Sequence, residues 1–181
     1  MLNPAVFLDR DGVLVKPVVR DGIAYAPRRW EDFSLLPGAA AAVATLRSSG
    51  FIVIVATNQP EVRRGTLGPD LLVEFHQRLR ELVPVNDIMC CCHDDRDNCE
   101  CRKPRPGMIL DAARRRQIDL GRSYLVGDTG RDLGAARAAG LPFILIDAPY
   151  NQDLRPDYRV PGLPEAAALV LRLAGRPPML S

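Results

Sequence analysis

The sequence lacks any apolar run of 18 or more residues, so it predicts no transmembrane helix. It also lacks low-complexity tracts and internal repeats, and its 47% hydrophobic and 25% charged residues are typical of a globular protein. The N-terminus has neither the charged start nor the small-residue cleavage site of a signal peptide, which predicts a cytoplasmic protein. A chain of 181 residues can bury a core without covalent cross-links, so we expect one domain.

Lysine is scarce. Only Lys16 and Lys103 are lysines, and the other 22 of the 24 basic residues are arginines. Because so general a bias reflects genome composition, a role for any one arginine in binding anions has to be argued at its own site. The formal net charge of +2 gives no reason to expect a nucleic-acid partner.

Cysteine is confined to one short stretch. All five cysteines lie at positions 90, 91, 92, 99 and 101, close to His93. A disulfide framework would be spread across the fold, and a cytosolic protein would keep its thiols reduced. Clustering beside a histidine indicates a metal site instead.

Apolar runs and helical periodicities alternate along the chain. The runs predict strands at residues 5–9, 51–56, 87–91, 123–126, 142–146 and 158–160. The periodic segments predict helices at residues 39–49, 69–82, 106–117, 130–139 and 163–173. His76, on the second of these helices, is predicted to be an ordinary surface or core histidine. Strands that alternate with helices predict an α/β fold with a doubly wound, Rossmann-like parallel sheet.

Residues 14–30 do not fit this alternation. The segment contains Pro17, Gly22 and Pro27, and it is too polar for the core and too long for a simple connection. Long irregular segments inside compact domains are usually functional flaps. We therefore predict an irregular, mobile flap here.

Unusual polar residues follow four of the predicted strands. They are Asp9 and Asp11, Thr57 and Asn58, Arg102 and Lys103 beyond the cysteines, and Asp128 with Asp132. In a doubly wound sheet, ligands bind beyond the carboxyl ends of the strands. A cluster of carboxylates suits a hard cation, most plainly Mg²⁺. A lone lysine and a hydroxyl suit a phosphoryl group, and aspartate is a known nucleophile toward phosphorus.

These residues carry a resemblance to a known family. The motifs concerned are Asp9-x-Asp11-Gly12, Thr57-Asn58, Lys103-Pro104 and Gly127-Asp128-x-x-x-Asp132. They resemble, in the same order, the four motifs of the haloacid dehalogenase (HAD) superfamily of phosphatases, and they span positions 9–132. The resemblance narrows, through residues 7–12, 57–59 and 99–104, to the branch that holds heptose bisphosphate and histidinol-phosphate phosphatases.

That branch is essentially capless and carries a zinc loop. The resemblance therefore implies a single HAD-like phosphatase domain over residues 1–181, with a flap at about 14–32 and a zinc loop at about 90–102. We also expect a monomer that acts on a small phosphorylated substrate and, from the net charge and the lack of a long apolar run, has no nucleic-acid or membrane partner.

The resemblance also implies roles for the matched residues. Asp9 would be the nucleophile and Asp11 the general acid/base, while Thr57 and Lys103 would hold the transferring phosphoryl group. The implied Mg²⁺ ligands are Asp9, the backbone carbonyl of Asp11, and Asp128. Asp132 would orient Asp128 or a metal-bound water. The residues expected to contact the substrate are Tyr25, Asn58, Gln59, Arg64 and Arg102.

The implied zinc ligands are Cys91, His93, Cys99 and Cys101. Three thiolates and one imidazole form a closed tetrahedral site, which is structural rather than catalytic. Such a site would order the loop that presents Arg102 and Lys103. Either Cys90 or Cys92 could replace Cys91, but strand alternation places those two on the face opposite Cys91, so one set is spare.

Substrate choice rests on smaller features. Residues 103–108 and Arg64 resemble the heptose enzymes and predict hydrolysis of the 7-phosphate of D-glycero-D-manno-heptose 1,7-bisphosphate. The short loop, with five residues between His93 and Cys99, instead resembles the histidinol-phosphate branch. Histidinol phosphate and other small phosphate esters therefore stay open as alternative substrates. Two departures affect specificity. Pro60-Glu61 replaces the usual Ser-Gly, and Thr129 replaces a common lysine that could meet a distal phosphate.

The flap contacts substrate in this family. Tyr25 matches a tyrosine found there, and Arg20, Arg28 and Arg29 are candidates for binding a second phosphate. For each of the arginines, a solvated loop is an equally good interpretation.

Two other classes of protein share part of the pattern. A phosphoacceptor signalling domain also combines a parallel sheet with aspartates, a threonine and a lysine, but its phosphorylated aspartate follows the third strand, which here ends in cysteines. A zinc-dependent interaction module would keep the cysteines and His93 but has no use for the carboxylates and Lys103 together.

Overall fold

The protein is described by a computed structural model of residues 2–175, and residues 1 and 176–181 of the predicted domain lie outside the described part. Its centre is a six-stranded, entirely parallel sheet in the order β5-β4-β1-β6-β7-β8. The strands are β1 (Ala5–Leu8), β4 (Ile52–Asn58), β5 (Asp87–Cys91), β6 (Tyr124–Gly127), β7 (Phe143–Ile146) and β8 (Tyr158–Val160). The chain winds outward from β1 first toward β5 and then toward β8. The predicted doubly wound α/β fold is confirmed.

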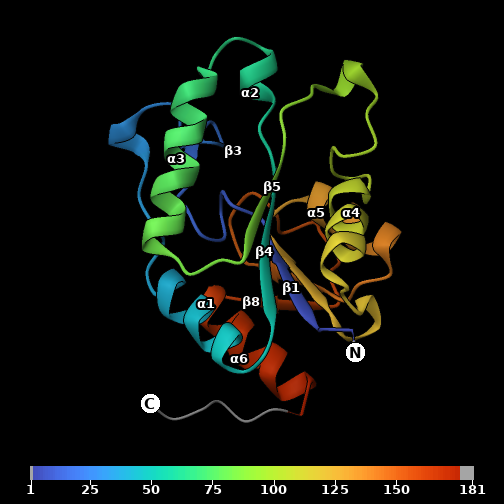
Figure 1. Ribbon diagram of the computed structural model, residues 1–181. Coiled ribbons are helices and arrows are strands. Elements are labelled where there is room, and N and C mark those ends of the chain that lie inside the picture. Colours follow the sequence, from blue (N-terminus) through green and yellow to red (C-terminus); the bar gives the residue numbers. More distant parts are fainter. Residues whose placement is uncertain (1, 176–181) are drawn as a thin grey trace.

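Helices cover both faces of this sheet (Figure 1). Three lie on one face, namely α1 (Ala39–Ser48), α3 (Pro69–Leu82) and α6 (Leu163–Leu173). Two lie on the other, namely α4 (Gly107–Arg116) and α5 (Gly130–Ala139). Within residues 2–175, no helix is long and apolar enough to cross a membrane.

Burial on both faces explains the continuous apolar runs. In β1, Val6 and Leu8 join the core beneath α1 and α6, whereas Ala5 and Phe7 join the core beneath α4 and α5. Successive side chains of a strand point to opposite faces, so a strand covered on both sides needs apolar residues at every position. β1 therefore lies in the middle of the sheet and carries the chain to the carboxyl edge at Asp9.

The flap is more ordered than predicted. A hairpin of β2 (Val18–Arg20) and β3 (Ile23–Tyr25) replaces the expected irregular segment, and its turn at Asp21 and Gly22 has positive φ at both residues, 51° and 73°. Aspartate followed by glycine favours this two-residue turn, which is the signal that the prediction missed. The prediction that the whole segment is too polar for the core is also wrong, because Leu14 and Val15 are fully buried.

The remaining short elements were not predicted. They are the helix α2 (Pro60–Arg63) and the 3₁₀ helices η1 (Trp30–Asp32), η2 (Asp95–Asp97) and η3 (Leu120–Arg122). In η1, Trp30 packs edge-on against Phe75 of α3, with ring centroids 5.0 Å apart. This contact attaches the flap to the body of the domain.

Candidate active site

A cavity of about 340 Å³ lies beyond the carboxyl ends of the central strands. It is lined by strand ends, the flap, α2, the first residues of α5 and the segment after the cysteines. The predicted site residues in its wall are Asp9, Asp11, Tyr25, Asn58, Arg64, Arg102, Lys103 and Asp128. Thr57, Gln59 and Asp132, also predicted, are fully buried and do not line the cavity. Residues that are distant in sequence therefore meet where the sheet topology requires.

Lys103 lies between two carboxylates. Its Nζ is 2.9 Å from Oδ1 of Asp9 and 2.5 Å from Oδ1 of Asp132, and its side chain is only 3% exposed. Burial lowers the pKa of Lys103, but the charges of Asp132 and Asp9 outweigh that effect and leave the pKa raised. Lys103 is therefore a fixed cation.

Asp9 has one oxygen held and one oxygen available. Its Oδ1 also accepts a hydrogen bond from the backbone N–H of Arg10 at 2.7 Å, whereas Oδ2 has no partner among the described residues. Burial raises the pKa of Asp9 to about 7, with the charge of Asp132 acting in the same direction and that of Lys103 opposing it. An unpartnered carboxylate oxygen in the cavity wall suits a nucleophile.

Asp128 is the most isolated carboxylate in the site. Oδ2 accepts a hydrogen bond from the Tyr150 hydroxyl at 2.6 Å, but Oδ1 is buried without a partner in the described part of the chain. Burial and the charge of Asp9 raise the pKa of Asp128 well above its ordinary value. Gly12, with φ +87°, leaves room for this carboxylate, because a Cβ there would collide with it. An orphaned, crowded carboxylate of this kind fits a bound cation.

One ligand atom from each of Asp9, Asp128 and Asp132 can lie within 4.8 Å of the others. Both Asp132 oxygens are already engaged, Oδ1 by Lys103 and Oδ2 by the backbone N–H and hydroxyl of Thr129. The predicted ligands Asp9 and Asp128 are thus brought together, whereas the side chain of Asp132 binds Lys103 and Thr129, and its orienting role stays a prediction.

Asp11 is held by a buried arginine that sequence reasoning did not identify. Arg10 is 0% exposed, and its Nη2 donates to Oδ2 of Asp11 at 2.9 Å. Gln59 donates to the same oxygen at 2.8 Å. On its other side, Arg10 Nη1 lies 3.2 Å from Nε2 of His76, so this histidine has a specific partner. Burial, followed by the charge of Arg10, lowers the pKa of His76 to about 4.

Thr57 and Asn58 end β4 beneath the cavity. The Thr57 hydroxyl accepts a hydrogen bond from Nε2 of Gln59 at 2.9 Å. Asn58 makes two reciprocal bonds with the backbone of Lys103, donating to its carbonyl at 2.9 Å and accepting from its N–H at 3.1 Å. The Asn58 amide therefore fixes the segment that carries Lys103, and its substrate contact stays a prediction.

Cys91, His93, Cys99 and Cys101 form a compact group at the end of β5. The three sulfur atoms are 3.2–3.7 Å apart, and Nδ1 of His93 is 3.2 Å from Sγ of Cys101. Zinc bonds of about 2.0–2.3 Å give tetrahedron edges of roughly this length. Cys90 and Cys92 lie apart from this group, with their sulfur atoms 3.7 Å from each other and packed near Phe75. The sequence left open whether Cys91, Cys90 or Cys92 joins the metal site, and the structure groups Cys91 with His93.

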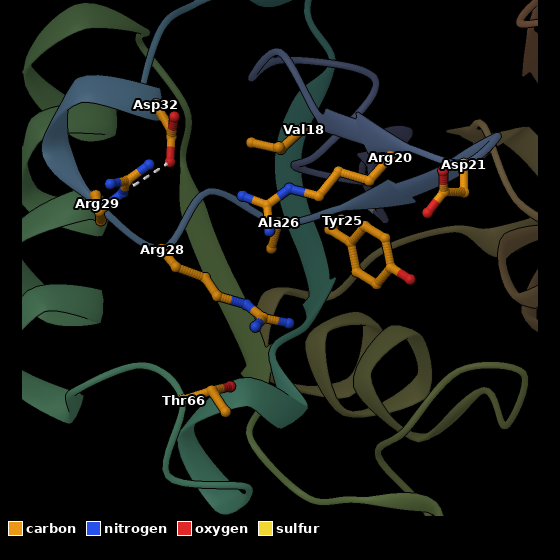
Figure 2. Close-up of a pocket in the computed structure, with 9 residues that line it drawn as sticks. All are labelled: Val18, Arg20, Asp21, Tyr25, Ala26, Arg28, Arg29, Asp32 and Thr66. Atoms are coloured by element: carbon orange, nitrogen blue, oxygen red, sulfur yellow. Dashed lines mark hydrogen bonds and ion pairs between the residues drawn. The ribbon is translucent and has the colours of Figure 1, made fainter.

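A second cavity, of about 570 Å³, lies under the flap and is shown in Figure 2. Arg20, Arg28 and Arg29 line it, but none of them lines the cavity that contains Asp9. Arg29 is 3.4 Å from Asp32, and the Arg28 guanidinium is 5.9 Å from the Tyr25 ring centroid. Of the four flap candidates, only Tyr25 belongs to both cavities.

Two further residues that sequence reasoning missed are Tyr150 and Arg131. Tyr150 follows β7 and reaches Asp128, and the next residue, Asn151, donates to the Asp128 carbonyl at 2.8 Å. The available signal was positional, because β7 also ends at the edge of the sheet that carries the other polar residues. Arg131, in the first turn of α5, lines the cavity.

Comparison with known proteins gives a consistent result. The family model for haloacid dehalogenase-like hydrolases matches residues 28–140. A D-glycero-beta-D-manno-heptose-1,7-bisphosphate 7-phosphatase of Rhodopseudomonas palustris is 39% identical over 152 residues, covering 77% of this chain and 81% of that protein. A D-glycero-alpha-D-manno-heptose-1,7-bisphosphate 7-phosphatase of Mycobacterium bovis is 37% identical over 145 residues, covering 75% and 74%.

Among solved structures, the D,D-heptose 1,7-bisphosphate phosphatase from B. bronchiseptica, complexed with magnesium and phosphate, superposes with a TM-score of 0.81. It is 31% identical, and the match covers 94% of this chain and 99% of that one. The similar proteins include enzymes for both anomers of the sugar, so sequence identity does not indicate which anomer this chain would hydrolyse.

Proposed function

This chain belongs to the haloacid dehalogenase-like hydrolase family, and from that premise we propose that it removes the 7-phosphate of D-glycero-D-manno-heptose 1,7-bisphosphate. It is a phosphoric monoester hydrolase. The observation that carries the proposal is the cluster in which Lys103 pairs with Asp9 at 2.9 Å, beside the unpartnered Oδ1 of Asp128. Related phosphatases at 34–39% identity support the choice of substrate.

Mg²⁺ fits the residues present, since Asp128 offers a buried oxygen without a partner and Asp9 has a free Oδ2. Asp9, Asp128 and the backbone carbonyl of Asp11 would hold it, and when bound it neutralises charge on the phosphoryl oxygens. Lys103 supplies further positive charge, and the Thr57 hydroxyl, which is buried beneath the cavity, would donate a hydrogen bond to the same phosphoryl group.

Hydrolysis then proceeds in two displacements. A carboxylate oxygen of Asp9 attacks phosphorus, the bond from phosphorus to the sugar oxygen breaks, and Asp11 donates a proton to the leaving sugar oxygen. Asp11, now a carboxylate, takes a proton from water as that water attacks the aspartyl-phosphate. Phosphate leaves, and Asp9 returns to its starting state. Arg10 and Gln59 hold Asp11 in place for both proton transfers.

Histidinol phosphate is the second candidate substrate. The short span of five residues between His93 and Cys99 favours it, because a loop of this length resembles that of the histidinol-phosphate branch. A phosphoacceptor signalling role is disfavoured, since the candidate nucleophile follows the central strand β1. The third strand of the six-stranded sheet along the chain, β5, ends in the cysteines. An interaction module would not require the Lys103 cluster.

A substrate panel tests the proposal. We expect kcat/KM for one anomer of the heptose bisphosphate to exceed the value for histidinol phosphate by at least about a hundredfold, because a substrate with two phosphates makes an additional charged contact. Comparable or faster hydrolysis of histidinol phosphate would replace the proposed substrate. The proposed monomeric state can be measured on the same sample by light scattering, and the single-domain organisation by a single cooperative unfolding transition.

A further inference from the structure

The loop between His93 and Cys99 carries three aspartates that each pair with arginine from another part of the chain. Asp94 binds Arg64 of the α2 end at 2.5 Å and 3.0 Å, and Asp97 lies 3.3 Å from Arg63. Asp95 differs from the other two, because it pairs with two arginines at once. The loop is thus connected by charge to the walls of the cavity.

Arg102 and Arg131 share the single carboxylate of Asp95. Nε of Arg102 donates to Oδ1 at 2.9 Å, and the two terminal nitrogens of Arg131 donate to Oδ1 and Oδ2 at 2.9 Å and 3.2 Å. Two guanidinium groups beside one carboxylate leave a surplus positive charge. Nη2 of Arg102 and Nε of Arg131 take part in no hydrogen bond within residues 2–175. Both residues line the cavity that contains Asp9.

Arg131 lies at the end of a helix that favours anions, and Asp95 is the one carboxylate it contacts among the described residues. It is the second residue of α5, where the positive end of the helix dipole disfavours a cation and favours an anion. Thr129, at the position where a lysine is common in the resembling family, carries no charge. Its hydroxyl caps α5 and binds Asp132. Asp95 offsets only part of the positive charge, since it serves two arginines. The wall formed by Arg102 and Arg131 therefore suits a dianion such as phosphate.

We propose that Arg131, together with Arg102, binds the phosphate of the substrate that is not hydrolysed. This inference rests on the proposed function, since it requires a substrate with two phosphates. It assigns that phosphate to the cavity of Asp9 rather than to the flap cavity of Figure 2, whose arginines lie outside the reacting site. Arg131 is then a specificity residue, and the preference for a bisphosphate depends on its planar, two-nitrogen donor group.

The test compares heptose 1,7-bisphosphate with the same sugar carrying only the 7-phosphate. In the wild type we expect kcat/KM to be at least tenfold higher for the bisphosphate. Arg131→Ala should reduce this ratio about tenfold or more, and Arg131→Lys, which keeps the charge without the planar donor pair, should give an intermediate ratio. Arg63→Ala is the matched control, because Arg63 pairs with Asp97 of the same loop but does not line the cavity.

The outcomes separate the inference from the proposed function. A wild-type ratio near one, or a ratio unchanged in Arg131→Ala, overturns the inference while leaving the phosphatase activity intact. A ratio that falls in Arg20→Ala but not in Arg131→Ala assigns the second phosphate to the flap cavity and also overturns it. A wild-type enzyme inactive toward both heptose phosphates refutes the proposed substrate itself, and the inference fails with it.

Discussion

Two carboxylates leave β1 one residue apart, yet their surroundings differ. Asp9 faces Lys103 and keeps one oxygen free in the cavity, whereas Asp11 accepts hydrogen bonds from Arg10 and Gln59. The motif predicted a division of roles between them, but it did not indicate what holds Asp11. A charged side chain such as Arg10 is expected at the surface. Its complete burial follows from tertiary packing against His76, which no local pattern in the sequence reports.

Tyr150 provides a test of how Asp128 is oriented. Tyr150→Phe removes the hydroxyl that donates to Oδ2 of Asp128 at 2.6 Å, so neither carboxylate oxygen of Asp128 keeps a hydrogen-bond partner among the described residues. Partners of metal-binding carboxylates typically contribute 10–100-fold to metal affinity, so we expect the Mg²⁺ concentration for half-maximal activity to rise by about that factor. Tyr158→Phe, at an exposed strand, is the matched control and should retain the wild-type value. An unchanged Mg²⁺ requirement in Tyr150→Phe would contradict this role.

His76 makes stability depend on pH. Its pKa is lowered from an ordinary 6.5 to about 4, so in this window the unfolded chain takes up a proton that the folded protein does not. The free energy of unfolding should therefore fall as pH is lowered from 6.5 toward 4, by up to on the order of 3 kcal/mol from this group. His76→Gln should flatten that part of the curve in urea unfolding measured at several pH values. A variant that retains the full wild-type slope would show that other groups cause the dependence.

At the scale of elements, the cysteine loop and the flap were predicted with different success. The spacing of cysteines along β5 separated Cys91 from Cys90 and Cys92, because alternation in a strand is a strict geometric rule. The flap hairpin was missed because its two strands have three residues each and bury little. Short, exposed strands produce no hydrophobic pattern, and the Asp21-Gly22 turn was the only local signal.

The cysteine loop offers a pair of closely matched variants. Cys91→Ser removes one proposed zinc ligand, whereas Cys92→Ser removes a neighbouring thiol that lies outside the group. We expect near-stoichiometric zinc in the wild type and in Cys92→Ser, and only traces in Cys91→Ser, by elemental analysis of the purified proteins. Activity should fall at least about tenfold in Cys91→Ser, since Arg102 and Lys103 directly follow the last ligand. Equal zinc content in the two variants would refute the proposed ligand set.

At the scale of the whole molecule, the sheet order explains why the site lies where it does. β1 is central, β4 and β6 flank it, and their carboxyl ends deliver Asp9, Thr57 and Asp128 to one edge. The placement of these three residues at one edge could be predicted from the alternation of strands and helices, which is a strong and repeated signal. The positions of Tyr150 and Arg131 in the site could not be predicted in this way, because they depend on how the loops beyond the sheet pack against one another.

In the proposed reaction, Asp9 attacks the 7-phosphate of the heptose bisphosphate. The most direct measurement follows that substrate by ³¹P NMR with Mg²⁺ present, for the wild type and for Asp9→Asn. We expect the wild type to release one equivalent of phosphate and leave the 1-phosphate on the sugar. Asp9→Asn, which replaces the nucleophilic carboxylate with a neutral amide of the same size, should be at least about a thousandfold slower. Full activity in Asp9→Asn, or loss of the 1-phosphate in the wild type, would contradict the account.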